Sequence, residues 1–440
     1  MRYIFTIISI FCASLSAQTT ADFEYCGHDK LVEDAKANHP AEYQEWENAY
    51  IKMAQSSRLQ RRGIVEDTTF TLRVVVHLVY SNSTENISDA LIHSQIQVLN
   101  ESFGHYHADT ANVRTLFKSR AGDIGIRFEL AKTDSNGNPT TGIVRQVTTK
   151  SSFGSARTDV KFRKDGGSDA WDPTRYFNIW ICDLSAGGSD NLLGFATPPS
   201  THPFWTATGS GAYPLNEQGA VLHYKIVGVN NPLSSQVTSN PDKGRVAVHE
   251  VGHYLGLRHI WGDGLGSTGC TVDDFIEDTP NQSRSSNFAC NKNSNTCNTG
   301  SDDEPNMVEN YMDYSGDDCM VMFTAQQRTV MRSALTKYRP NIASKTEINR
   351  TYVRDDFTTS LNVYYNNDDR LTIDVNDDRL TDYSYSLYNL AGQKMGKDLP
   401  LNNTSQEVNF RNFADGLYVL QIKVKNQEEP ILTQKVQNIK

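Results

Sequence analysis

Apolar and polar residues alternate with two different periods along most of the chain. TLRVVVHLVY at 71–80 is rich in β-branched residues and ends at a polar turn, which predicts a buried strand. IRFEL at 126–130 and YFNIWICDL at 176–184 predict further strands. Residues 90–104 have apolar positions at helical spacing after Ser88, a typical N-cap residue. This succession predicts an α/β domain with a mixed, twisted sheet.

The pattern changes beyond residue 345. Residues 324–338 predict a last helix that ends before Pro340. Short alternating strands then follow, separated by turns rich in asparagine and aspartate, with NDDRL occurring twice. Gly392 and Gly416 are expected in hairpin turns. The shift predicts a separate all-β sandwich module over residues 343–440.

The segment HEVGHYLGLRH carries the clearest chemical signal. In a helix, His249 and His253 are one turn apart on the same face, so one metal can bind both. Glu250 follows the first histidine and can take a proton from bound water and pass it to a leaving amine. Pro241, upstream, suits the first turn of such a helix.

Gly256 and His259 extend this motif. Gly256 can adopt the left-handed conformation that ends a helix, which returns His259 as a third ligand. Three protein ligands leave a fourth position for water, whose pKa zinc lowers to about 7. Two histidines and a glutamate also suit a solvated helix face, but the longer pattern favours catalytic zinc.

The extended motif HExxHxxGxxH resembles that of the metzincin metallopeptidases, which also carry a methionine turn. NYMDY provides a candidate turn at Met312, a residue type that otherwise fills cores. The blocks HEVGHYLGLRHIWGDG, CTVDDFIEDTP and NYMDYSGDDCMVMFTAQQ narrow the resemblance to the pappalysin family, over residues 26–340. The resemblance implies a metzincin-like catalytic domain with His249, His253 and His259 as zinc ligands.

The same resemblance assigns further roles. Glu250 would be the general base and acid, and Tyr314 would help to stabilise the tetrahedral intermediate. Asp317 matches an aspartate at the base of the pocket for the residue after the scissile bond. A recessed carboxylate favours arginine, and lysine as a second choice. The alternative for Asp317 is a solvated acid in an acidic turn.

The segment CTVDDFIEDTP concentrates hard oxygen ligands, as calcium requires. The resemblance implies that Asp274 and Thr279 are among the ligands of a structural calcium ion. The spacing is not that of an EF-hand. Without the resemblance, this cluster would be a polar loop.

The length of 440 residues is enough for two domains with cores of their own. A net charge of −10 gives no support for nucleic-acid binding. Residues 1–17 combine a basic residue, an apolar stretch and small residues, which predicts a secretory signal and not a membrane span. The mature chain is therefore expected outside the cytoplasm, without stable membrane insertion and as a monomer.

Six cysteines remain after removal of the signal, and four of them lie after the zinc motif, in the stretch that leads up to and just past the candidate methionine turn. An oxidising compartment allows bridges, and four cysteines permit three pairings. The family resemblance implies Cys270 with Cys297 and Cys290 with Cys319. Cys182 lies in an apolar run and is expected to be a buried thiol.

Cys26 precedes the first predicted core strand, and a thiolate can take the place of water on zinc. We therefore expect residues 18–57 to form a pro-segment that blocks the metal. AQSSRLQRRG ends this segment, so a basic-preferring peptidase could cut itself between Ser57 and Arg58 or near Arg61 and Arg62. A disulfide to Cys182 and an exposed thiol are the alternatives for Cys26.

The C-terminal stretches YSLYNLAGQKMGK and FADGLYVLQIKVKN resemble the sorting domain of proteins exported by the type IX secretion machinery. A carbohydrate- or protein-binding module is the alternative. The expected chain is a signal peptide, a pro-segment, a catalytic domain over 58–342 and this module. This organisation and the zinc motif together predict a secreted zinc endopeptidase that acts on proteins and peptides. The competing function class is a cell-surface adhesin with structural zinc.

Overall fold

The computed structural model describes residues 23–59, 68–154, 157–185, 191–199, 214–263, 269–297, 300, 303–339 and 341–347. In the C-terminal part it describes 360–365, 371–376, 383–389, 392–401, 405–408, 410, 413–414, 416–424, 430 and 432–438. The expected signal peptide, Arg61 and Arg62 lie outside the described residues, as does most of both NDDRL segments.

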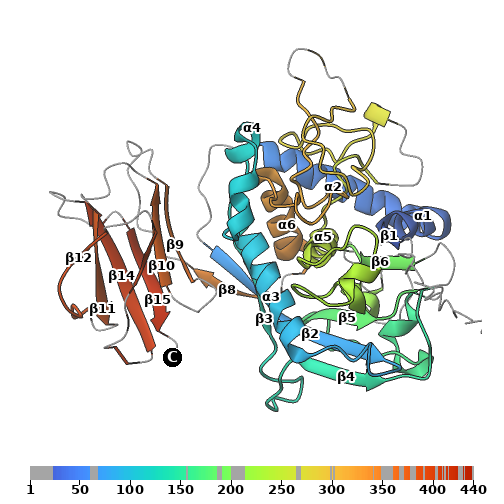
Figure 1. Cartoon of the computed structure of the whole chain (residues 1–440), viewed down its shortest axis with the longest axis horizontal. Coiled ribbons are helices and arrows are strands. Elements are labelled where there is room, and N and C mark those ends of the chain that lie inside the picture. Colours follow the sequence, from blue (N-terminus) through green and yellow to red (C-terminus); the bar gives the residue numbers. More distant parts are fainter. Residues whose placement is uncertain are drawn as a thin grey trace, which may run out of the picture.

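One mixed sheet organises the first part of the chain (Figure 1). Its strand order is β1-β6-β7-β5-β2-β3, and β4 and β8 also pair with β2. The bounds are β1 Phe23–Cys26, β2 Thr68–Tyr80, β3 Ile126–Leu130, β4 Ile143–Val147, β5 Phe177–Cys182, β6 Asn191–Ala196, β7 Ala220–His223 and β8 Ala343–Glu347. β2 runs parallel to β3, β4 and β5, β6 runs antiparallel to β7, and β1 runs parallel to β6. The predicted α/β class is confirmed.

β2 is buried on both faces, which explains its nearly continuous apolar sequence. Leu72, Val74 and Val76 belong to the main core, whereas Val75 and Val79 pack into clusters of their own. The helices are α1 His28–Asn38, α2 Pro40–Leu59, α3 Asp89–Gly104, α4 Thr115–Lys118, α5 Arg245–Tyr254 and α6 Ala325–Tyr338. α5 packs against α3, β6 and β7, and α2 packs against α6.

Several predicted boundaries are confirmed. Ser88 caps α3 by accepting the N–H of Leu91, and Thr324 opens α6 with a reciprocal capping box to Gln327. The prediction that Pro241 lies in the first turn of the helix is wrong, because α5 begins only at Arg245, after Gly244 in a left-handed conformation.

The C-terminal module consists of strands only in its described residues. Its sheets have the orders β13-β10-β9 and β12-β11-β14-β15. The bounds are β9 Ser360–Tyr365, β10 Leu371–Asn376, β11 Tyr383–Asn389, β12 Leu399–Pro400, β13 Ser405–Glu407, β14 Gly416–Val424 and β15 Leu432–Asn438. Leu371, Ile373, Leu420 and Ile422 belong to its own core.

Two details of this module differ from expectation. Residues 343–347 form β8 in the first sheet, because they pair antiparallel with β2, so the expected boundary at 343 is too early. Gly416 opens strand β14 and is not a turn residue, since it pairs with Asn438. Gly392 does lie in a turn, with a φ of 79°.

Candidate functional site

α5 carries His249, Glu250 and His253, and all three side chains are fully buried. The helix stops because Gly256 has a φ of 91°, a conformation that strains residues with a Cβ. Leu257 N–H then donates to Gly252 O at 2.9 Å and closes the helix end. The chain turns at this point and brings His259 back beside the helix, as the sequence predicted.

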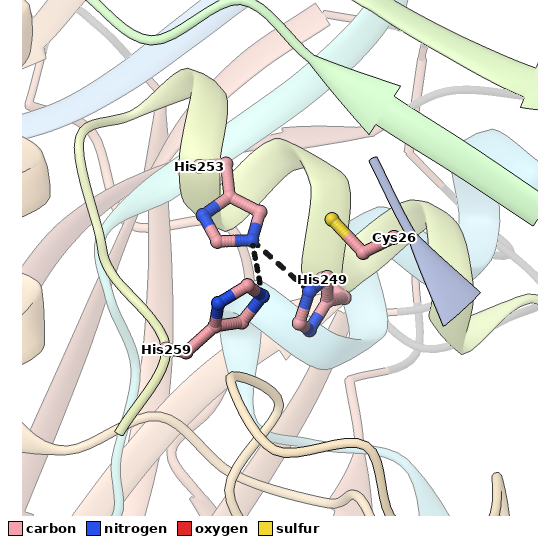
Figure 2. Close-up of side chains that lie close together, drawn as sticks. All are labelled: Cys26, His249, His253 and His259. Carbon is pink, nitrogen blue, oxygen red and sulfur yellow. Dashed lines mark hydrogen bonds between the residues drawn. The ribbon is translucent and has the colours of Figure 1, made fainter. Parts of the chain in front are cut away.

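The three imidazoles face one another (Figure 2). Nε2 of His253 lies 3.1 Å from Nε2 of His249 and 3.1 Å from Nε2 of His259. Cys26 at the end of β1 completes a buried group whose ligand atoms all lie within 4.8 Å of one another. The structure therefore brings together three nitrogens and one sulfur from two distant parts of the chain.

The outer nitrogens of the rings decide which atoms face inward. Nδ1–H of His249 donates to Tyr311 O at 2.7 Å, and Nδ1–H of His253 donates to Leu257 O at 2.9 Å. Both rings therefore point an Nε2 lone pair into the cluster. Lone pairs cannot satisfy one another by hydrogen bonding, but they suit a cation, so the donor set fits a metal such as zinc.

Charge supports the same assignment for two of the three rings. Burial lowers the pKa of both His249 and His253 well below the usual value, so these rings are neutral, as metal ligands must be. Burial also opposes the charge on His259, but the carboxylates of Asp29 and Asp263 outweigh it and raise the pKa of His259 to about 10. Its Nδ1 lies 3.4 Å from each of these carboxylates, which fixes the ring orientation.

Glu250 lies beside the cluster in a space that a glycine leaves open. A Cβ on Gly194 of β6 would lie 3.0 Å from Cγ of Glu250. Oε2 accepts a hydrogen bond from Sγ of Cys26 at 3.5 Å, and Oε1 has no hydrogen-bond partner among the described residues. Burial raises the pKa of Glu250 to about 8, which suits a group that holds and releases a proton near neutral pH.

Met312 and Tyr314 lie below and beside the histidines. Met312 is fully buried under Gly252 of α5. The hydroxyl of Tyr314 lies 2.9 Å from Nε2 of His259, on the inner side of the cluster. The segment 310–314 therefore has the position that a methionine turn requires.

Cys26 is neither disulfide-bonded nor exposed. Both Cys26 and Cys182 are free and buried, which rules out the alternative bridge between them and confirms Cys182 as a buried thiol. Burial raises the pKa of the Cys26 thiol, and a cation in the cluster would oppose this effect by stabilising the thiolate. His28 follows, stacking on His253 with ring centroids 3.8 Å apart.

The other two cysteine pairs are bonded as the resemblance implied, Cys270 to Cys297 and Cys290 to Cys319. Asp317 is only 7% exposed, which contradicts the solvated alternative. Its Oδ2 accepts the N–H of Lys243 at 3.0 Å, and burial raises its pKa to about 6.

Asp274 and Thr279 lie together in a separate loop. Oγ1 of Thr279 is 2.9 Å from each carboxylate oxygen of Asp274 and 2.7 Å from Ile276 O. Burial raises the pKa of Asp274 well above its ordinary value. These converging oxygens fit a hard cation such as calcium.

The sequence interpretation missed the groups around the ligands. Asp263 accepts from the backbone N–H of His259 at 3.1 Å and lies 2.9 Å from Nε2 of His28. Its spacing of four residues after His259 was an available signal. Arg258 forms a two-pronged ion pair with Glu47 of α2, at 2.5 and 3.1 Å, which nothing local in the sequence indicates.

Comparisons with known proteins agree with this geometry. A family model described as pregnancy-associated plasma protein-A, a peptidase family, matches residues 161–336. A second model, the secretion system C-terminal sorting domain, matches residues 363–436. An extracellular metalloprotease of Arthroderma otae is 26% identical over 269 residues, which cover 61% of this chain and 79% of that protein.

Solved structures are similar over the same region. A promirolysin mutant from Tannerella forsythia is 39% identical, with a TM-score of 0.59, covering 72% of this chain and 97% of that one. Mature mirolysin of the same organism, in complex with a cleaved peptide, is 42% identical with a TM-score of 0.55, covering 62% and 95%. Among the described residues, none of the helices has both the length and the apolar character needed to cross a bilayer.

Proposed function

The chain belongs to the pappalysin family and is a metalloendopeptidase that is secreted or held at the cell surface; on this premise we propose that its metal is zinc and that it is made as a zymogen. The convergence of three Nε2 atoms, with those of His249 and His259 each 3.1 Å from that of His253, is the observation that carries the proposal. The set of three imidazole nitrogens and one sulfur favours zinc over hard cations.

Zinc would be held by His249, His253 and His259, and would supply an activated water and polarise the scissile carbonyl. Glu250 would take a proton and later give it to the leaving amine, a task for which its pKa of about 8 is suitable. The hydroxyl of Tyr314, which faces the same space, would donate to the developing oxyanion. Met312 would support the ligands from below.

Latency would come from residues up to Ser57. Cys26 occupies the fourth position around the cluster, and β1 lies along β6. Glu47 of α2 holds Arg258, next to the third histidine, and Tyr50 donates to Asp274 O at 2.7 Å. The similarity to a pro-form and to a mature form among known structures supports a removable segment.

Activation would need local unwinding of α2. The bond between Ser57 and Arg58 lies inside this helix, and Ser57 is 2% exposed, with Oγ 3.2 Å from Oε1 of Gln326. Proteases bind extended chains, so the last turn of the helix must open before self-cleavage at this bond.

The substrates would be proteins cut before arginine or lysine. Asp317 is recessed, and its Oδ1 has no hydrogen-bond partner among the described residues. An arginine guanidinium would supply the missing donors and neutralise the buried charge. Asp274 and Thr279 would hold a structural calcium ion, and the enzyme would act as a monomer after type IX export.

A second candidate keeps the metal structural. With Cys26 in place the cluster has four protein donors, as a closed site would have, and the chain could then serve as an adhesin. N-terminal sequencing after incubation separates the two. A new terminus at Arg58 supports the zymogen, whereas an intact chain that binds zinc but does not hydrolyse casein supports the adhesin.

The test of the zinc site combines metal analysis with hydrolysis. Purified protein is expected to contain one zinc per chain and to lose casein hydrolysis in a chelator. Glu250→Ala is expected to retain the metal and lose hydrolysis. Retained hydrolysis in this variant, or a protein that binds no zinc, would contradict the proposal.

A further inference from the structure

The side chain of Tyr25, next to Cys26, fills a site beside the candidate metal centre. Tyr25 is 3% exposed. Its ring stacks on Tyr314 with centroids 4.7 Å apart, and lies 5.2 Å from His249 and 5.5 Å from Phe288. The site therefore has aromatic walls and adjoins a ligand histidine.

The base of the site is chemically mixed. The hydroxyl of Tyr25 donates to Sδ of Met320 at 3.4 Å. Asp317 is near enough for its charge to add to burial in raising the pKa of Tyr25. A thioether thus lies at the end of a slot lined by rings, with the carboxylate of Asp317 in its vicinity. This is the place that the proposed function assigns to the residue after the scissile bond.

Residues outside the pro-segment hold this slot together. Nη1 of Arg245 donates to Asp317 O and Met320 O, each at 2.7 Å, which fixes the base. Phe288 has a φ of 61°, unusual for a residue with a side chain, and its N–H donates to Tyr314 O at 2.6 Å. These contacts hold the base and one wall of the slot without a contribution from Tyr25.

The carboxylate of Asp313 ties the Phe288 segment to the methionine turn. Its Oδ1 accepts the N–H of Ser286 at 2.9 Å and the N–H of Tyr314 at 2.8 Å. The wall that carries Phe288 is thus anchored one residue from Met312. A side chain that enters the slot meets two rings held at fixed positions.

We propose that this slot accepts tyrosine as well as arginine, so that the enzyme also cleaves peptide bonds on the amino side of tyrosine. The inference rests on the proposed function for the place of the slot in catalysis. Arginine and tyrosine can both use the aromatic walls of the slot, because a guanidinium also stacks on aromatic faces before it reaches a carboxylate. A phenol ring uses the same faces and places its hydroxyl at Met320, as Tyr25 does.

The test uses the self-processed enzyme and four peptides that differ only in the residue after the scissile bond: arginine, tyrosine, alanine and glutamate. The tyrosine peptide is expected to have a kcat/KM at least about tenfold above that of the alanine peptide, the factor of one good aromatic contact. Mass spectrometry identifies the bond cut. A tyrosine peptide cut no faster than the alanine peptide, while the arginine peptide is cut, overturns the inference and leaves the proposed function intact.

Variants of the slot separate its two parts. Phe288→Ala, with Phe288→Leu as a variant that keeps the bulk, is expected to lower kcat/KM for the tyrosine peptide more than for the arginine peptide. Asp317→Asn is expected to lower kcat/KM for the arginine peptide more than for the tyrosine peptide. If the tyrosine peptide is cut and the arginine peptide is not, the inference holds and the proposed arginine preference fails. If none of the four peptides is cut, both fail.

Discussion

A Cβ atom on Gly252 would lie 2.4 Å from Sδ of Met312, so α5 and the segment around Met312 pack this closely only because this helix position lacks a side chain. We expect Gly252→Ala to lower the free energy of unfolding by about 1–3 kcal/mol, the usual range for overpacking a core. Urea unfolding measures this change in the free energy of unfolding. Met312→Ala opens the space, so the double variant should lose less stability than the two single losses added together. If the stability losses of the two single variants simply add in the double variant, Gly252 and Met312 are not in the proposed packing relationship.

Replacement of Cys26 tests latency. We expect Cys26→Ala to process itself faster than the wild type, because the fourth position of the cluster is no longer occupied. Cys182→Ala is the matched control, since Cys182 is the other free, buried cysteine and lies in β5. The appearance of the new N-terminus is followed by gel and sequencing. Equal rates for both variants would argue against a role of Cys26 in latency.

The hydroxyl of Tyr314 is expected to matter in the transition state more than in substrate binding. Tyr314→Phe keeps the ring that contacts His259 and removes only the donor. We predict that kcat falls by about 100-fold or more, with little change in KM and in zinc content. A variant with wild-type kcat would exclude the assigned role.

Calcium is expected to stabilise the loop that contains Asp274. Without a cation, burial of this carboxylate is unfavourable, as its raised pKa indicates. Added calcium should raise the melting temperature of the wild type, and Asp274→Asn should abolish most of the increase. Asp165→Asn, far from the loop in sequence, serves as the control. An undiminished calcium effect in the Asp274 variant would place the ion elsewhere.

His77 predicts a pH dependence of stability. Its Nε2–H donates to Asn178 Oδ1 and its Nδ1 accepts from Ser168, both at 2.9 Å, so the neutral ring already satisfies both neighbours. Burial lowers the pKa of His77 to about 4. The unfolded chain binds this proton near pH 6.5, so stability falls as the pH drops from there to about 4, by about 1.4 kcal/mol per pH unit.

His77→Gln should reduce this slope by about that amount. The measurement is urea unfolding at several pH values, in the Glu250→Ala background so that self-cleavage does not interfere. A slope equal to that of the parent would show that His77 does not titrate in the way its surroundings require.

The parts of the site that lie close together in sequence could be predicted. His249, Glu250, His253 and His259 fall within one helix and its terminating turn, so their spacing predicts that the side chains converge. Strands such as β2 were also predictable, because burial on both faces requires a nearly continuous apolar run.

Groups brought together across the chain could not be predicted. Arg245 reaches the carbonyl oxygens of Asp317 and Met320, and Tyr25 reaches Met320, through contacts that depend on the complete sheet. FEYC has only four residues and no periodicity from which its pairing with β6 could be inferred. The polar environment of each ligand ring therefore required the structure.

The pairing of β1 with β6 also covers one edge of the first sheet. While β1 is present, the backbone groups of β6 on that side are satisfied by the chain itself, with Gly27 N–H donating to Gly194 O at 2.9 Å. An uncovered strand edge recruits extended segments of other proteins and promotes aggregation. If the residues up to Ser57 are removed, as proposed, this edge of β6 would be uncovered and could pair with an extended substrate chain; as long as β1 stays in place, the edge is protected from such contacts.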